Sequence, residues 1–153
     1  MRVYFLRHGQ ADWPDWSKPD DERPLTKQGK KEMERVAEFL RALKLPRFRL
    51  FSSPLPRAWQ TAEIAAEKLK LEVEKESALG KGFNAAKLRS LIKRAKDGDL
   101  MIVGHEPDFS SVVAELTGGD VKLAKAAIAR VDLDDSARNG RLIWLVPPKL
   151  IRT

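Results

Sequence analysis

The sequence predicts an α/β protein: a three-layer α/β/α sandwich with a mostly parallel central sheet and an antiparallel hairpin at its C-terminal end. Short, strand-forming apolar segments alternate with longer segments whose apolar residues recur at helical spacing. The last two apolar segments are separated by a tight turn instead, which is typical of an antiparallel hairpin. With 153 residues and no internal repeat, linker or low-complexity tract, the chain is expected to form a single domain over residues 1–153.

The first half of the chain carries two strand–helix units. Residues 2–6 are rich in strand formers, and Thr26 is a candidate N-cap for a helix whose apolar residues recur at intervals of three and four. Pro54 is expected to open the second helix, because proline is tolerated in a first turn. The expected elements are a strand at 2–6, a loop at 9–24, a helix at 26–43, a strand at 48–53 and a helix at 54–69.

The second half continues this alternation and closes with the hairpin. Gly118 and Gly119 are expected to end the fourth helix, and Arg138-Asn139-Gly140 to form the turn between the last two strands. The expected elements are a strand at 71–75, a helix at 85–95, a strand at 100–103, a helix at 109–116 and strands at 127–133 and 141–146.

The composition is that of a soluble globular protein, with 42% apolar and 33% charged residues. No apolar run approaches the ~20 residues needed to cross a bilayer, and the apolar segment 1–6 is too short for a signal-peptide core. We therefore expect a cytoplasmic protein without a membrane partner. The sequence has no cysteine, which excludes disulfides, thiolate zinc sites and cysteine nucleophiles.

The net charge of +7 has two interpretations. The positive residues are spread over the expected helices, which is typical of a solvated surface. The alternative is attraction of an anionic partner, either a phosphorylated substrate or a nucleic acid. A nucleic-acid partner is not expected, because the sequence has no nucleic-acid-binding motif and no basic stretch interleaved with aromatic residues.

Side chains suited to phosphate chemistry follow three of the expected strands. Arg7 and His8 come after the first strand, Arg57 lies shortly after the second, and His105 follows the fourth. Ligands of such sheets bind beyond the carboxyl ends of the strands, so one cleft could hold all four side chains.

These residue types in one cleft favour phosphoryl transfer. A neutral histidine is a nucleophile towards phosphorus, and arginine donates bidentately to phosphate oxygens. The free N–H groups of the helix that carries Arg57 would also favour an anion. Each residue alone would more often be structural, whereas the combination indicates a phosphate site with His8 as the candidate nucleophile.

Four short motifs occur in order along the chain. They are RHG at 7–9, RPLT followed by a glycine at 23–29, SSPLPRAWQTA at 52–62 and VGHEP at 103–107. Together they resemble the histidine phosphatase superfamily, which includes phosphoglycerate mutases and acid phosphatases. Within it, the chain is most similar to the small SixA-type phosphohistidine phosphatases. The resemblance extends from residue 2 to about residue 150 without a large insertion.

The resemblance implies a phosphoglycerate mutase-like fold and a phosphatase that forms a phosphohistidine intermediate on His8, which water then hydrolyses. Arg7, Arg57 and His105 would bind the phosphoryl group and neutralise its charge in both steps. The resemblance also implies that no metal and no other cofactor is needed. The two histidines form no HxxH motif and there is no Asp-rich loop of the calcium-binding kind, so the sequence offers few metal ligands.

The expected substrate depends on whether a general acid is present. A phosphate ester usually needs a proton for its leaving oxygen, and in mutase-like relatives a glutamate after the third strand supplies it. Residues 76–80 lack that pattern, and Glu106 is either a possible general acid or a solvated residue before a helix. A phosphoramidate breaks its P–N bond more readily, and the chain has no insertion that could cover a small molecule. We therefore expect phosphohistidine on a protein partner as the substrate.

Two alternatives stay open. One is a phosphatase for small phosphate esters that uses Glu106 as its acid. The other is a non-catalytic module that binds phosphate or nucleic acid, although such a module would not need an intact set of four catalytic positions. The loop after His8 contains acidic residues that could repel unsuitable anions or guide a basic partner: Asp12, Asp15, Asp20 and Asp21.

Overall fold

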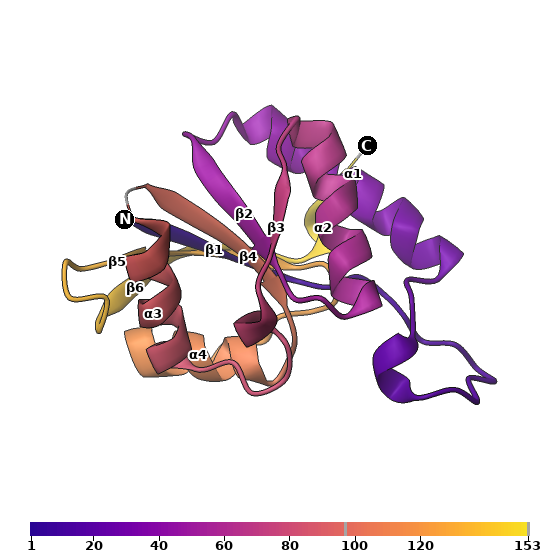
Figure 1. The fold of residues 1–153 in the computed structure, drawn as a ribbon. Coiled ribbons are helices and arrows are strands. Elements are labelled where there is room, and N and C mark those ends of the chain that lie inside the picture. The colour runs from indigo at the N-terminus through magenta and orange to yellow at the C-terminus, as the bar shows by residue number, and fades with distance from the viewer. Residues whose placement is uncertain (97, 153) are drawn as a thin grey trace.

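The computed structural model describes residues 1–96 and 98–152. A six-stranded sheet with the order β3-β2-β4-β1-β5-β6 lies between two layers of helices (Figure 1). The strands are β1 (Arg2–Arg7), β2 (Phe48–Ser52), β3 (Val73–Lys75), β4 (Asp99–Gly104), β5 (Ile128–Leu133) and β6 (Gly140–Val146). The α-helices are α1 (Lys27–Leu43), α2 (Pro56–Leu69), α3 (Ala85–Ala95) and α4 (Asp108–Thr117), with short 3-10 turns at Asp20–Glu22, Ser77–Leu79 and Pro148–Leu150.

The predicted layer sandwich is confirmed. Strands β1 to β4 are parallel, and β5 pairs antiparallel with both β1 and β6. Successive side chains of β1 enter opposite layers, because side chains alternate across a strand. Tyr4 and Leu6 pack in the core under α1 and α2, whereas Val3 and Phe5 pack in the core under α3 and α4. Among the described residues, no helix is long and apolar enough to span a bilayer.

Two predicted boundaries are wrong by two residues. Helix α2 begins at Pro56 rather than Pro54, because Leu55 precedes a proline and is extended, with φ −64° and ψ 137°. Strand β3 begins at Val73 rather than Leu71, because the backbone N–H of Leu71 still donates to the carbonyl of Ala66 at 2.9 Å and closes the end of α2.

The register of the three central strands places their carboxyl ends at one level. Arg7 lies opposite Gly104 in the parallel β1–β4 pair, and Ser52 lies opposite Val103 in the β2–β4 pair. The backbone N–H of His8 continues the ladder by donating to Gly104 at 3.1 Å. The residues that follow each strand therefore emerge side by side, as the sequence predicted.

Helix α1 is fixed at its start by a cap and by a close approach of the chain. The hydroxyl of Thr26 accepts a hydrogen bond from the backbone N–H of Gly29, which confirms the predicted N-cap. Gly29 lies directly against the backbone of Gln10, and a Cβ atom at Gly29 would overlap the Gln10 carbonyl oxygen. This contact holds the start of α1 against the segment that follows His8.

We expect Gly29→Ala to destabilise the protein, although alanine normally stabilises a helix relative to glycine by about 1 kcal/mol. The added methyl group must displace the Gln10 backbone, so the free energy of unfolding should fall by about 1–3 kcal/mol in urea denaturation. Lys30→Ala, at an exposed position of the same helix, is the control and should change stability little. A Gly29→Ala protein as stable as the wild type would contradict the close approach.

Candidate active site

The structure brings the predicted histidines and arginines together at the carboxyl ends of β1, β2 and β4. The ring centroids of His8 and His105 are 5.3 Å apart. Both rings are buried, as is Arg57 on the first turn of α2, and Arg7 is half-buried. The positive charges of Arg57 and Arg7 both act on His8, and that of Arg57 also acts on His105. All four predicted side chains therefore share one site.

His8 is held in one tautomer. Its Nδ1 lies 2.7 Å from the carbonyl oxygen of the neighbouring Gly9, and because a carbonyl only accepts, Nδ1 carries the proton. Burial lowers the pKa of His8 to about 3 against the opposing effect of the hydrogen bond to Gly9, and the positive charges of Arg57 and Arg7 lower it further. The ring is therefore neutral near pH 7, with its free electron pair on Nε2. This is the form of histidine that can attack phosphorus.

His105 is held by Ser53, a residue of the SSPLPRAWQTA motif whose role the sequence did not reveal. Its Nε2 lies 2.8 Å from the hydroxyl of Ser53, which also accepts a hydrogen bond from the backbone N–H of Leu55 at 3.2 Å. Burial lowers the pKa of His105 to about 4, and the charge of Arg57 lowers it further. The SSPLPRAWQTA motif was the only sequence signal for Ser53.

Both arginines keep unused donors beside the histidines. Arg7 donates through Nη1 to the carbonyl of Leu123 at 3.0 Å, and Arg57 donates through Nη1 to the carbonyl of Asp20 at 3.2 Å. The Nε atoms of both arginines and Nδ1 of His105 are buried and have no hydrogen-bond partner within the described residues. Buried donors are normally satisfied, so this group of donors fits an oxyanion.

The start of α2 offers fewer N–H groups for an anion than the sequence suggested. Pro56 has no N–H, and the backbone N–H groups of Ala58 and Trp59 both donate to the carbonyl of Leu55, at 3.0 and 2.9 Å. The side chain of Arg57, rather than the amides of Ala58 and Trp59, is therefore what this helix contributes to the site.

A buried threonine connects α2 to the segment that holds His8. The hydroxyl of Thr61 donates to the carbonyl of Arg57 at 2.7 Å and accepts from the backbone N–H of Gly9 at 3.0 Å. Gly9 is the residue whose carbonyl fixes the His8 tautomer. Thr61 thus couples the position of His8 to the turn of helix that carries Arg57. The sequence showed Thr61 only as part of a motif, without a role.

Glu106, the possible general acid, has a structural contact of its own. Its Oε1 accepts a hydrogen bond from the backbone N–H of Ser110 at 2.7 Å, at the start of α4. Its negative charge also acts on Arg7, whose pKa is lowered by burial and partly restored by Glu106. Glu106 therefore lies near the site while one of its oxygens caps a helix.

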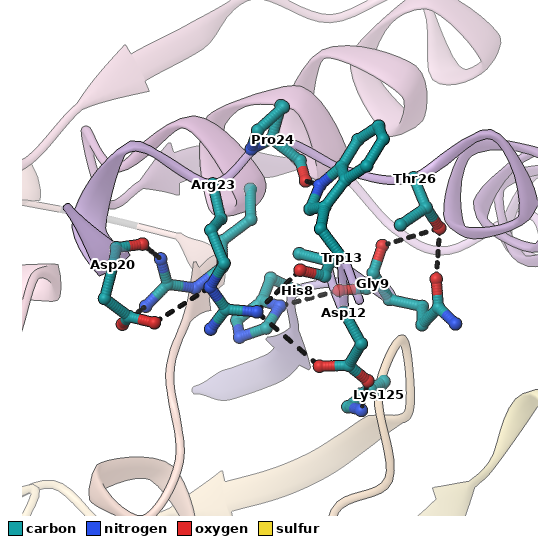
Figure 2. A network of polar contacts seen from close by, with 12 residues as sticks. His8, Gly9, Asp12, Trp13, Asp20, Arg23, Pro24, Thr26 and Lys125 are labelled. Atoms are coloured by element: carbon teal, nitrogen blue, oxygen red, sulfur yellow. Dashed lines mark hydrogen bonds and ion pairs between the residues drawn. The ribbon is translucent and has the colours of Figure 1, made fainter. Parts of the chain in front are cut away.

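Two parts of the loop after His8 are joined by an arginine that the sequence had not indicated as a site residue. Figure 2 shows Arg23 between the two sides of this loop. Arg23 donates through Nη1 to the carbonyl of Ala11 at 2.6 Å and through Nε to the carboxylate of Asp20 at 2.8 Å. The pKa of Arg57 is lowered by burial and also by the charge of Arg23. The RPLT motif was the only sequence signal for this residue.

The described residues contain no group of three or more histidine, aspartate or glutamate side chains that could hold a metal ion. The chemistry that this arrangement offers comes from its side chains. It combines a neutral imidazole with a free Nε2, a second neutral imidazole and two guanidinium groups.

Comparison with known proteins identifies the class. The family model described as histidine phosphatase superfamily (branch 1) matches residues 3–80. Phosphohistidine phosphatase SixA of Escherichia coli is 33% identical over 156 residues, which cover 97% of this chain and 94% of that protein. An uncharacterized protein of Picosynechococcus sp. is 36% identical over 137 residues, which cover 84% of this chain and 82% of that protein.

Solved structures agree with this assignment. A structure of the protein histidine phosphatase SixA complexed with tungstate has a TM-score of 0.85 and 32% sequence identity, and the match covers 98% of this chain and 99% of that chain. The chain belongs to the histidine phosphatase superfamily. Its fold is that of the phosphoglycerate mutase-like histidine phosphatases, and the SixA homologues support assignment as a phosphatase.

Because both histidines are neutral in the folded protein, we expect stability to fall in mild acid. Their pKa values of about 3 and about 4 lie below the ordinary value of about 6.5, so the unfolded chain binds more protons between these limits. The free energy of unfolding should therefore fall as the pH falls from about 6.5 towards 4. Urea denaturation over this range should show a shallower fall for His8→Asn, which cannot take up the proton. An equal fall in both proteins would contradict the burial of a neutral His8.

Thr61→Val should slow turnover, because it removes the hydroxyl that joins Gly9 to Arg57 while keeping the size of the side chain. The loss of two buried hydrogen bonds should lower kcat by about tenfold or more. Thr61→Ser keeps the hydroxyl and should stay within about threefold of the wild type. Steady-state kinetics would separate kcat from KM. Equal rates for the valine and serine variants would show that the hydroxyl does not position the site.

Proposed function

We propose that this protein hydrolyses phosphohistidine on a protein partner through a phosphohistidine intermediate on His8. The observation that carries the proposal is the state of His8, a buried neutral imidazole with its proton on Nδ1 and its electron pair on Nε2. Unpartnered buried donors of Arg7, Arg57 and His105 accompany it. A nucleophile among donors for an oxyanion is the arrangement that phosphoryl transfer requires.

The reaction has two displacements at phosphorus. In the first, Nε2 of His8 forms a bond to phosphorus while the bond to the substrate nitrogen breaks, and that nitrogen keeps the electron pair. In the second, water attacks phosphorus, the bond to Nε2 breaks and inorganic phosphate leaves. Arg7 and Arg57 neutralise the charge on the phosphoryl oxygens in both steps. When Ser53 donates to Nε2 of His105, the Nδ1 proton of that ring is available to a phosphoryl oxygen.

Two observations support phosphohistidine as the substrate. A P–N bond needs less help from a general acid than an ester P–O bond, and the candidate acid Glu106 uses one oxygen to cap α4. In addition, a relative that is 33% identical over nearly the whole chain is named a phosphohistidine phosphatase.

A second candidate function is hydrolysis of small phosphate esters. It is favoured by the position of Glu106, whose charge acts directly on Arg7. In this reaction Glu106 would act as the general acid and give a proton to the leaving oxygen, and a hydroxyl product would leave.

Turnover of two substrates by metal-depleted protein tests these proposals. We expect phosphate release from a histidine-phosphorylated protein in the presence of EDTA, with a loss of at least about 1,000-fold in His8→Ala because the nucleophile is removed. Glu106→Gln should leave this rate within about threefold, since no strong acid is needed. Unchanged turnover in His8→Ala would contradict the mechanism.

Other outcomes point to the alternatives. Faster turnover of glycerol phosphate that collapses in Glu106→Gln would favour the phosphatase for small esters. Tight, salt-sensitive binding of nucleic acid without any hydrolysis would favour a non-catalytic module.

A further inference from the structure

A set of carboxylates surrounds the phosphate site, and we call it the acidic rim. Its members are Asp12, Asp20, Asp21, Glu106 and Asp108. Each exerts its charge on one or more of Arg7, Arg57 and His105. These residues come from the loop after His8 and from the start of α4, so the rim lies on two sides of the site.

The positions of the rim carboxylates are fixed by contacts. The carboxylate of Asp20 lies 3.8 Å from Nη2 of Arg57. Oδ2 of Asp108 accepts hydrogen bonds from the backbone N–H groups of Gly82 and Phe83, at 2.9 and 3.2 Å. Glu106 is held by its bond to Ser110. The negative charges are therefore held in place around the arginines.

Three cations lie next to the acidic rim, and each is paired with one of its carboxylates. Arg23 binds Asp20 at 2.8 Å and Asp12 at 3.5 Å, and Lys81 binds Asp21 at 2.6 Å. Lys125 also binds Asp12, as Figure 2 shows. Within the described residues, each of these three cations is therefore engaged by a carboxylate. A substrate with a second anionic group would have to displace one of these partners.

The centre of the site contains cationic and neutral hydrogen-bond donors, in contrast to the carboxylates of the acidic rim. Arg57 and His105 are each only 5% exposed, and their Nε and Nδ1 atoms have no partner within the described residues. Together with Arg7 they can accept one oxyanion. Around that oxyanion and its two arginines, the five carboxylates of the acidic rim outnumber the three cations that pair with them. A phosphoryl group matches the centre, and a neutral or positive leaving group matches the rim.

We propose that the acidic rim selects phosphoryl donors whose leaving group is cationic or neutral and rejects those that carry a second anionic group. This inference rests on the proposed function and narrows its substrate class to phosphohistidine in a neutral or basic setting. The rim stabilises the substrate imidazole when it is protonated on the nitrogen that does not carry phosphorus. The P–N bond then breaks, its electron pair stays on the imidazole, and a neutral ring leaves without a proton from a general acid.

Three small substrates that differ in one charge test the selection. They are phosphohistamine, whose side arm is cationic, the methylamide of N-acetyl-phosphohistidine, which is neutral there, and N-acetyl-phosphohistidine, which carries a carboxylate. We expect kcat/KM to fall in that order, by about fivefold per unit of charge at low salt. The differences should shrink in 1 M salt, where the screening length is about 3 Å.

A matched pair of variants assigns the effect to the rim. Asp21→Asn removes a rim carboxylate and releases Lys81 from its ion pair, so it should raise the relative kcat/KM of the carboxylate substrate. Glu38→Gln is the control, because Glu38 is an exposed carboxylate near the end of α1 that binds Lys68 at 3.4 Å, at the end of α2 opposite to the turn that carries Arg57. It makes the same change in charge and should leave the ratios unchanged.

The possible failures can be distinguished. Equal kcat/KM for all three substrates, or the same change in both variants, would overturn the selection by the rim and leave the proposed function intact. No hydrolysis of any of the three, with none of a phosphohistidine protein, would overturn the proposed function itself.

Discussion

The hydrogen bond from Nδ1 of His8 to the carbonyl of Gly9 determines which nitrogen of the ring can react. Burial keeps the ring neutral, and this contact places its proton on Nδ1, so that Nε2 has the free electron pair. The position of Gly9 in turn depends on Thr61, whose hydroxyl accepts from the Gly9 backbone and donates to the carbonyl of Arg57. The nucleophile and a phosphate-binding arginine are thereby fixed relative to each other.

The rest of the site follows from the sheet. The parallel pairing of β1 with β4 puts Arg7 opposite Gly104, so the next residues, His8 and His105, emerge together. Gly104 also leaves room for Phe109 of α4, since a Cβ atom at Gly104 would come within 2.7 Å of the Phe109 ring. The resulting charge distribution has two layers: cationic donors at the centre and carboxylates around them. The centre fits a phosphoryl group. We propose that the outer layer selects the leaving group to which this phosphoryl group is attached.

Sequence patterns were sufficient to predict the architecture and to select the four side chains at the centre of the site. Strand and helix periodicities gave the layers, and strand-end positions together with the motif resemblance selected Arg7, His8, Arg57 and His105. The boundary at Pro56 was missed because the effect of a proline on the preceding residue competes with its preference for a first turn. Ser53 and Arg23 were missed because their contacts join segments that are distant in sequence, His105 to Ser53 and Arg23 to Ala11. Such pairings depend on the register and on loop packing, which local patterns do not encode.

In the proposed mechanism, Nε2 of His8 carries the phosphoryl group during turnover. Rapid quenching under alkaline conditions, followed by peptide mass mapping and phosphorus NMR, would locate that group directly. We expect a single phosphorylated peptide containing His8, with phosphorus on Nε2, which forms before inorganic phosphate is released and decays as the phosphate appears. Phosphate release with the phosphoryl group on His105, or with no phosphorylated protein at any time, would contradict it.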